Sequence, residues 1–167
     1  NAQSEMRQEF TANVSHELKT PLTSISGYAF YGCKFLKTVT LPNIKFIGKS
    51  VFYNCSVLET VRLDSALMLG DNAFSGCVAL ENIDAPKLQV IGSRTFENCE
   101  KLASVDFPNL VQVGYYAFSR CAFEEITLPS VKQLEGGAFS YCKSLKTVEL
   151  PDMKSVPSDT FKGCASL

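Results

Sequence analysis

The chain has 167 residues, of which 46% are apolar and 20% charged, as in a single soluble folded unit. Sixteen basic and seventeen acidic residues give a formal net charge of −1, which argues against a nucleic-acid-binding protein steered by bulk charge. No apolar run reaches the length of about 18 residues that a membrane span needs. A single histidine and the absence of tryptophan argue against a metal centre or a catalytic triad, and we expect no cofactor.

The first 26 residues carry apolar side chains at helical spacing. These are Met6, Phe10, Val14, Leu18, Leu22 and Ile25. The spacing predicts a helix over roughly residues 4–19, because Pro21 removes a helical hydrogen bond and favours a break there. An isolated amphipathic helix is marginal in water. We therefore expect its apolar stripe to pack on the coil that follows, or on the same helix of a second chain in a homodimer.

Within this segment, Phe10 to Leu22 reads F-x-x-x-V-S-H-E-L-K-T-P-L. The string resembles the H box of sensor histidine kinases. The resemblance implies that His16 is a phosphoacceptor, that Glu17 assists proton transfer and that Thr20 belongs to an E-x-x-T phosphatase motif. Imidazole suits this role because it can be a neutral nucleophile near pH 7. No Asn-rich ATP box, D-x-G-x-G or G-x-G motif follows, so we do not expect autonomous kinase activity.

From Gly27 onward the chain repeats with a period of 22 residues. Cysteines lie at positions 33, 55, 77, 99, 121, 142 and 164, so that all but one of the spacings are 22 and the exception is 21. A phenylalanine precedes each cysteine by three residues, at positions 30, 52, 74, 96, 118, 139 and 161. The consensus is A-F-x-x-C-x-x-L-x-x-V-x-L-P-x-L-x-x-I-G. Such a period predicts a solenoid, in which stacked units bury a shared core.

Each part of the consensus has a physical role. The V-x-L stretch alternates apolar and polar residues, which predicts a short strand with one buried face, and proline then ends the strand. The A-F-x-x-C-x-x-L stretch places apolar side chains on one face of a helix or of 3₁₀ turns. The glycine that closes most units, as at Gly48 and Gly114, is expected to supply a turn conformation that other residues resist.

These units resemble the BspA-like leucine-rich repeat. The resemblance covers Gly27 to Leu167 and divides the chain into an H-box-like helical segment, residues 1–26, and a repeat domain, residues 27–167. It implies an α/β repeat fold: a curved solenoid of six to seven units, with parallel strands on the concave side and short helices or 3₁₀ turns on the convex side. Family members are typically bacterial surface or secreted proteins used in adhesion, which implies a cell-surface location; a functional H box would instead place the chain in the cytoplasm.

The seven cysteines invite a metal or disulfide interpretation, which their pattern disfavours. A zinc site needs C-x₂₋₄-C pairs, whereas no two cysteines here are closer than 21 residues. The number is odd, and side chains on adjacent coils point in the same direction rather than at each other. We expect buried free thiols that act as small apolar side chains.

Residues that alternate with the apolar strand positions are expected to face outward on the concave side. Their charged members are Arg62, Asp84, Asp106, Glu125 and Glu149, so that this face has a net charge of −3. Arginine is favoured at interface hot spots, and Arg62 is the single such residue here. We name these five residues as candidate binding residues, with a basic peptide, a sugar or a loosely held calcium ion as possible ligands and a merely solvated face as the alternative.

Three interpretations of function remain open. The first is a non-enzymatic interaction domain that binds a protein or glycan at a cell surface. The second is a phosphoacceptor fragment of two-component signalling, in which His16 accepts phosphate. The third is a recombined, truncated or engineered fusion without independent function.

Overall fold

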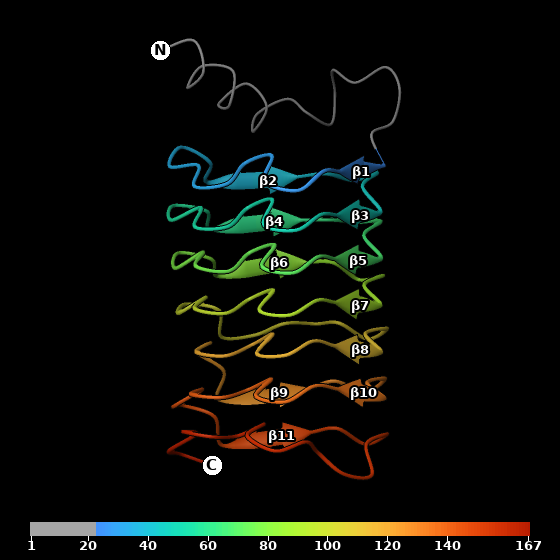
Figure 1. The fold of residues 1–167 in the computed structure, drawn as a ribbon, viewed down its shortest axis with the longest axis vertical. Coiled ribbons are helices and arrows are strands. Elements are labelled where there is room, and N and C mark those ends of the chain that lie inside the picture. The colour runs from blue at the N-terminus through green and yellow to red at the C-terminus, as the bar shows by residue number, and fades with distance from the viewer. Residues whose placement is uncertain (1–22) are drawn as a thin grey trace.

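The computed structural model describes residues 23–167 as a stack of coils built from eleven short strands, with no helix in that range (Figure 1). The strands are β1 (Ser24–Ile25), β2 (Thr38–Thr40), β3 (Phe46–Ile47), β4 (Thr60–Arg62), β5 (Met68–Leu69), β6 (Asn82–Asp84), β7 (Val90–Ile91), β8 (Gln112–Val113), β9 (Glu125–Thr127), β10 (Gln133–Leu134) and β11 (Thr147–Glu149). The expected parallel solenoid is confirmed. The expected N-terminal helix over residues 4–19 lies outside the described residues.

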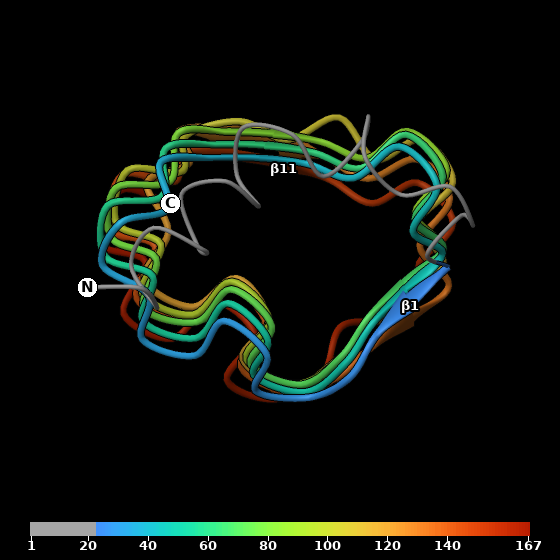
Figure 2. The same cartoon turned by 90° about the horizontal axis from the view of Figure 1, so that it is seen from above.

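Most coils contribute one strand to each of two walls, seen from above in Figure 2 on the sides labelled β1 and β11. The V-x-L strands form one wall as two parallel sheets, in the orders β2-β4-β6 and β11-β9. The other wall is a six-stranded parallel sheet, β1-β3-β5-β7-β8-β10, formed by residues just before the unit-closing position. Residues paired between neighbouring strands are 22 positions apart in the sequence, as in Val39↔Val61. They are 21 positions apart at Gln112↔Gln133, across the short unit. This second wall was not expected from the sequence.

The hydrophobic core fills the space that each coil encloses between the two walls. Its centre is a column of phenylalanine rings from Phe30 to Phe161, in which consecutive ring centroids lie 5.2 to 5.9 Å apart and the rings are nearly parallel. The five inner rings of the column are completely buried, whereas the two terminal rings are partly exposed. Each interior ring therefore contacts one ring above it and one below it.

The expected helices or 3₁₀ turns in the A-F-x-x-C segments are a wrong prediction, because each segment has two residues with left-handed backbone. These residues form two columns along the stack: 28, 50, 72, 94, 116, 137 and 159, and 32, 54, 76, 98, 120, 141 and 163. A right-handed helix cannot contain a left-handed residue at every fourth position. The segments instead form tight turns, as in Cys55 N–H to the Phe52 carbonyl, and donate to the next coil, as in Phe52 N–H to the Ala73 carbonyl at 2.9 Å.

The glycines that close the units have a role other than the one expected. None of Gly48, Gly70, Gly92 and Gly114 has a positive φ. They allow adjacent coils to approach closely: a Cβ placed on Gly70 would lie 2.8 Å from the carbonyl carbon of Gly48, and a Cβ on Gly114 would overlap the backbone of Gly92. The absence of a side chain, rather than conformational freedom, is what these positions require.

Replacing Gly114 by alanine should therefore destabilise the stack by about 1–3 kcal/mol, because the added methyl group meets backbone that cannot move aside locally. Gly136→Ala is the matched control, since its added methyl group would make only ordinary contacts, the nearest at 3.4 Å from the Ser158 carbonyl oxygen. Urea denaturation of both variants checks the difference. Equal stability of the two variants would contradict the close approach of coils at Gly114.

Candidate functional site

The outward residues of the V-x-L wall form a surface that we call the strand face. It comprises residues 38 and 40 on β2, 60 and 62 on β4, 82 and 84 on β6, 104 and 106 in the corresponding segment of the next coil, 125 and 127 on β9, and 147 and 149 on β11. All five candidate binding residues lie on it. One is basic and four are acidic, so the strand face carries a net charge of −3.

The strand face is interrupted in its middle, at a feature that we call the break. Residues 104–106 were expected to form a strand, but they form none, and β6 and β9 therefore belong to separate sheets (Figure 1). Elsewhere on this wall, Leu63 N–H donates to the Asp84 carbonyl at 2.8 Å, and Leu128 N–H donates to the Glu149 carbonyl at 3.0 Å. Within the described residues, no backbone hydrogen bond joins residues 104–106 to β6 or to β9.

The break coincides with a change in the size of the core residues. The position after the V-x pair, which is leucine in four coils, is Ala85 in one coil and Phe107 in the next. Phe107 is buried and stacks on Phe96, with ring centroids 6.1 Å apart. In the short unit, Phe123 takes the place of a leucine and packs edge-on against Phe118. The two extra rings lie in the core of the coil with residues 104–106 and of the coil that follows it, at positions where the regular coils hold leucine.

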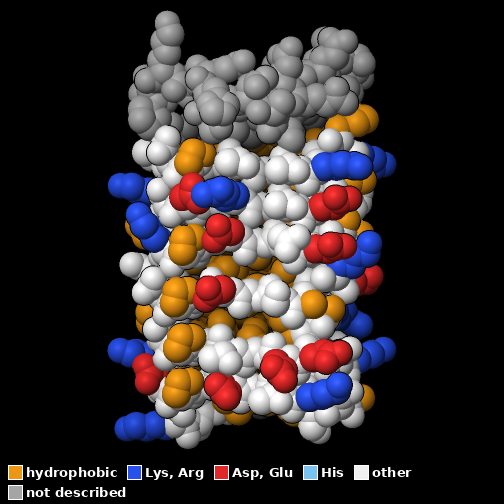
Figure 3. Space-filling model, turned by 180° about the vertical axis from the view of Figure 1, so that it is seen from behind, with side chains coloured by type: hydrophobic (Ala, Val, Ile, Leu, Met, Phe, Trp, Pro, Cys, Tyr) orange, Lys and Arg blue, Asp and Glu red, His pale blue; other side chains and the backbone are white. Residues whose placement is uncertain are grey.

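The break opens a hollow of about 460 Å³ in the strand face. Three consecutive V-x-L segments line it, with residues 60–62, 82–84 and 104–106. Apolar side chains form its floor: Val61 is 1% exposed and Ile83 8% exposed, and Val105 is only half-buried. Figure 3 shows this face, with apolar side chains visible between the rows in its middle and mostly covered above and below.

The charges around the hollow are unevenly paired. The Arg62 guanidinium contacts the Asp64 carboxylate at 2.9 Å, and this hydrogen bond, together with the charges of Asp64 and more weakly of Asp84, raises the pKa of Arg62. Asp84 and Asp106 form no ion pair with any described residue. The hollow therefore has a neutralised cation at one end and two uncompensated carboxylates along the rest of its length.

The two remaining candidates lie apart from the hollow. Glu125 begins β9 and Glu149 ends β11, on the far side of the break from Asp84. The Thr127 hydroxyl lies 3.5 Å from a carboxylate oxygen of Glu149. The fold thus brings together Arg62, Asp84 and Asp106, and it leaves Glu125 and Glu149 on a neighbouring, regularly paired sheet.

The cysteines are free thiols, as expected, and six of the seven are buried. From Cys55 onward, the Sγ atoms donate hydrogen bonds to phenylalanine carbonyls of preceding coils, as from Cys77 to Phe52 at 3.1 Å and from Cys99 to Phe74 at 3.2 Å. Burial raises the pKa of Cys77, Cys99 and Cys121 well above the ordinary value, and raises that of Cys142 to about 12. Such thiols stay protonated and are poor nucleophiles and metal ligands.

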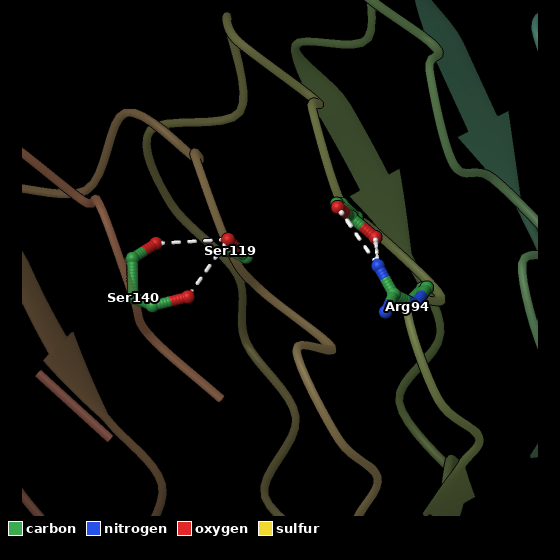
Figure 4. A network of polar contacts seen from close by, with 4 residues as sticks. Arg94, Ser119 and Ser140 are labelled. Atoms are coloured by element: carbon green, nitrogen blue, oxygen red, sulfur yellow. Dashed lines mark hydrogen bonds and ion pairs between the residues drawn. The ribbon is translucent and has the colours of Figure 1, made fainter. Parts of the chain in front are cut away.

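Buried hydroxyl groups also have structural partners. The Ser140 hydroxyl donates to the Ser119 hydroxyl at 2.9 Å, and Ser119 donates to the Ser140 carbonyl at 3.0 Å (Figure 4). Arg94, in the same view, pairs with Glu97 at 3.0 Å. Within residues 23–167, no group of three or more histidine, cysteine or acidic residues could hold a metal ion. The chain's single histidine, His16, lies outside the described residues together with Glu17 and Thr20.

Sequence reasoning did not anticipate the break, although signals for it were present. The change from leucine to Ala85, Phe107 and Phe123 in consecutive units, and the loss of one residue after Cys121, all occur around residues 104–106. The open backbone edges and the hollow follow from these changes and could not be read from the outward residues alone.

Comparison with known proteins identifies the repeat. The family description "BspA type Leucine rich repeat region" matches the chain in six copies, over residues 9–111 and 67–167. This match runs over the H-box-like string, and the comparisons give no support for a histidine kinase segment. No curated protein matches the chain.

Three solved structures share the fold. A leucine-rich repeat protein of T. pallidum is 33% identical with a TM-score of 0.78, and the match covers 86% of this chain and 71% of that one. A leucine-rich repeat protein from Bacteroides ovatus ATCC 8483 is 32% identical with a TM-score of 0.73, and the match covers 78% of this chain and 38% of the other. One from Eubacterium ventriosum ATCC 27560 is 20% identical with a TM-score of 0.68, a likeness of fold alone.

Proposed function

Because the chain belongs to the BspA-type leucine-rich repeat family, we propose that it is a non-enzymatic interaction domain whose strand face binds a protein or glycan partner. The observation that carries this proposal is the hollow in that face, where an apolar floor lies beside carboxylates that no described residue pairs. A binding surface needs both features, since apolar burial supplies affinity and charge supplies selectivity.

The family resemblance supports a location at the cell surface or in the secreted fraction. No helix in residues 23–167 meets the length and hydropathy that a bilayer crossing requires. Immunolabelling of intact cells of the source organism, with and without permeabilisation, tests the location. Labelling that needs permeabilisation would contradict it.

Replacement of Arg62, Asp84 and Asp106 by alanine together should remove binding at the strand face and leave the melting transition nearly unchanged, because the three side chains lie on the surface. Binders selected against the native protein from a peptide-display library and a glycan array are the probes. The control variant is Tyr31→Ala/Tyr53→Ala, which removes a stacked tyrosine pair with ring centroids 4.9 Å apart outside the strand face. Binders that tolerate the triple change and are lost with the tyrosine change would move the site to the turn side.

The signalling interpretation rests on the string from Phe10 to Leu22. It places a phosphoacceptor at His16, assisted by Glu17 and with Thr20 in a phosphatase motif, and it needs a kinase catalytic domain supplied in trans. Incubation with ATP and such a domain would give acid-labile label that is absent from a His16→Gln variant. Absence of label on the native protein would leave the string without this role.

A further inference from the structure

We propose that the break is a docking site for an extended basic segment of a partner protein, which adds its backbone to the open strand edges and its cations to Asp84 and Asp106. This inference rests on the proposed function and names the partner chemistry and the subsite for it. The occupant is a peptide strand because the open groups at the break are backbone groups, which a strand satisfies in series and a sugar does not.

The strand edges at the break have backbone N–H groups without partners in the part of the chain that the structure describes, in contrast to the equivalent groups of the regular coils. Ala85 is completely buried, and its N–H has no backbone acceptor among the described residues, whereas the equivalent N–H groups of Leu63 and Leu128 are both bonded to the next coil. The N–H of Ala103, an exposed residue, likewise has no backbone acceptor in residues 23–167, whereas the equivalent Glu81 N–H donates to the Glu59 carbonyl at 3.0 Å. An unpaired backbone group is costly where it is buried, as at Ala85, so a strand that pairs with it gains its hydrogen bond; at Ala103 the strand takes the place of water.

The negative charge around the break favours a partner segment with basic side chains. Asp84 and Asp106 flank the hollow without an ion pair among the described residues, and Arg62 is neutralised by Asp64. Within the sheet, Arg62 on β4 lies in register with Asp84 on β6, so neighbouring strands place a basic residue and a carboxylate at facing positions, although Arg62 itself pairs with Asp64. A partner strand that repeats this pattern would place a basic side chain outward beside a carboxylate of the break.

The apolar floor of the hollow determines which residues of the partner segment can lie between its basic residues. Side chains of a strand alternate between its two faces, so the neighbours of each basic residue point inward. They would meet Val105, which is half-buried, and Ile83. The recognised segment therefore alternates outward basic residues with inward small apolar residues; Thr60-Val61-Arg62 of β4 has the same inward and outward alternation, with one basic residue.

The probe is a fluorescent, end-blocked peptide of sequence Thr-Val-Arg-Val-Lys, and its binding is measured by anisotropy and by amide chemical shifts of the full chain. We expect saturable binding that shifts the amide signals of Ala85 and Ala103. The variant Asp84→Asn/Asp106→Asn should bind roughly five- to tenfold more weakly. Glu100→Gln/Asp152→Asn, which makes the same change of charge at exposed positions away from the break, should change the affinity less than about twofold.

Backbone pairing is tested separately from charge. Two analogues of the peptide, N-methylated at odd or at even positions, keep both cations but lose donors on one edge, and we expect at least one of them to lose binding. Equal binding of all three peptides, or amide shifts elsewhere on the strand face, would overturn docking at the break and leave the proposed function standing. Failure of the peptide to bind would also overturn this inference. The proposed function is tested separately, with the binders selected from the peptide-display library and the glycan array.

Discussion

Replacing Phe118 by alanine is expected to lower the free energy of unfolding by about 3–5 kcal/mol, the largest effect of any single substitution considered. Its ring is completely buried and packs face to face with Phe96 and Phe139, both with centroids 5.5 Å away, and edge-on with Phe123. Removing it leaves a cavity that the rigid stack of coils cannot close. Urea denaturation followed by far-ultraviolet circular dichroism measures the loss.

Phe161→Ala is the matched control for this loss. Phe161 ends the same column, contacts one ring at 5.9 Å and is only half-buried, so its removal should cost less than half as much. A comparable loss at both positions would show that the column does not act as a stack of mutually supporting rings. Loss of structure in the Phe118 variant in the absence of urea would be read as a destabilisation at or beyond the upper end of the expected range.

Raising the pH above 9 is expected to destabilise the fold steeply, through the buried thiols. Burial raises the pKa of Cys77, Cys99, Cys121 and Cys142 above the ordinary value of 9.0, to about 12 for Cys142. Between these values the unfolded chain has lost protons that the folded chain retains, so their contribution to stability is complete below pH 9 and falls as the pH rises. Each such thiol lowers the free energy of unfolding by about 1.4 kcal/mol per pH unit.

Other groups ionise in the same range, and a pair of substitutions isolates the thiols. In the variant Cys77→Ala/Cys99→Ala, two of the four thiols are gone, so the part of the slope that they cause should fall by about half. The measurement is the free energy of unfolding from urea titrations at pH 8, 9, 10 and 11, under reducing conditions. An unchanged slope in the variant would show that the thiols titrate alike in the folded and unfolded chains.

The repeat made most of the architecture predictable. The 22-residue spacing of Phe and Cys placed those side chains in the core and aligned the coils, because a side chain repeated at the same position in every coil stacks on itself. The alternation in Thr60-Val61-Arg62 correctly predicted a strand with Val61 inside. Buried free thiols were also predicted correctly, because the number of cysteines is odd and side chains at the same position of adjacent coils point in the same direction rather than at each other.

Two features could not be read from the period. The apolar spacing of A-F-x-x-C fits a helical face and a pair of turns equally well, and only the backbone, left-handed at Asn54 and Asn98, distinguishes them. We attribute the break to the different side-chain volumes of Ala85, Phe107 and Phe123 in adjacent coils. A consensus repeat does not show such differences between neighbouring units. The candidate residues Asp84 and Asp106 were placed on the correct face, but the hollow between them follows from packing behind it.

Amide hydrogen exchange of the free protein measures whether the strand ladder is interrupted at the break, and the proposed binding at the strand face depends on that interruption. The amides of Leu63 and Leu128 donate to the next coil, and the equivalent amide of Ala85 does not. We predict that the exposed Ala103 amide, which has no backbone acceptor among the described residues, exchanges at least about tenfold faster than the equivalent Glu81 amide, which must first break its hydrogen bond. The Ala85 amide likewise lacks such an acceptor but is completely buried, so we expect it to exchange faster than Leu63 and Leu128 by a smaller factor. Equally slow exchange at all five amides would mean that the ladder is continuous in solution, and would contradict an interrupted strand face.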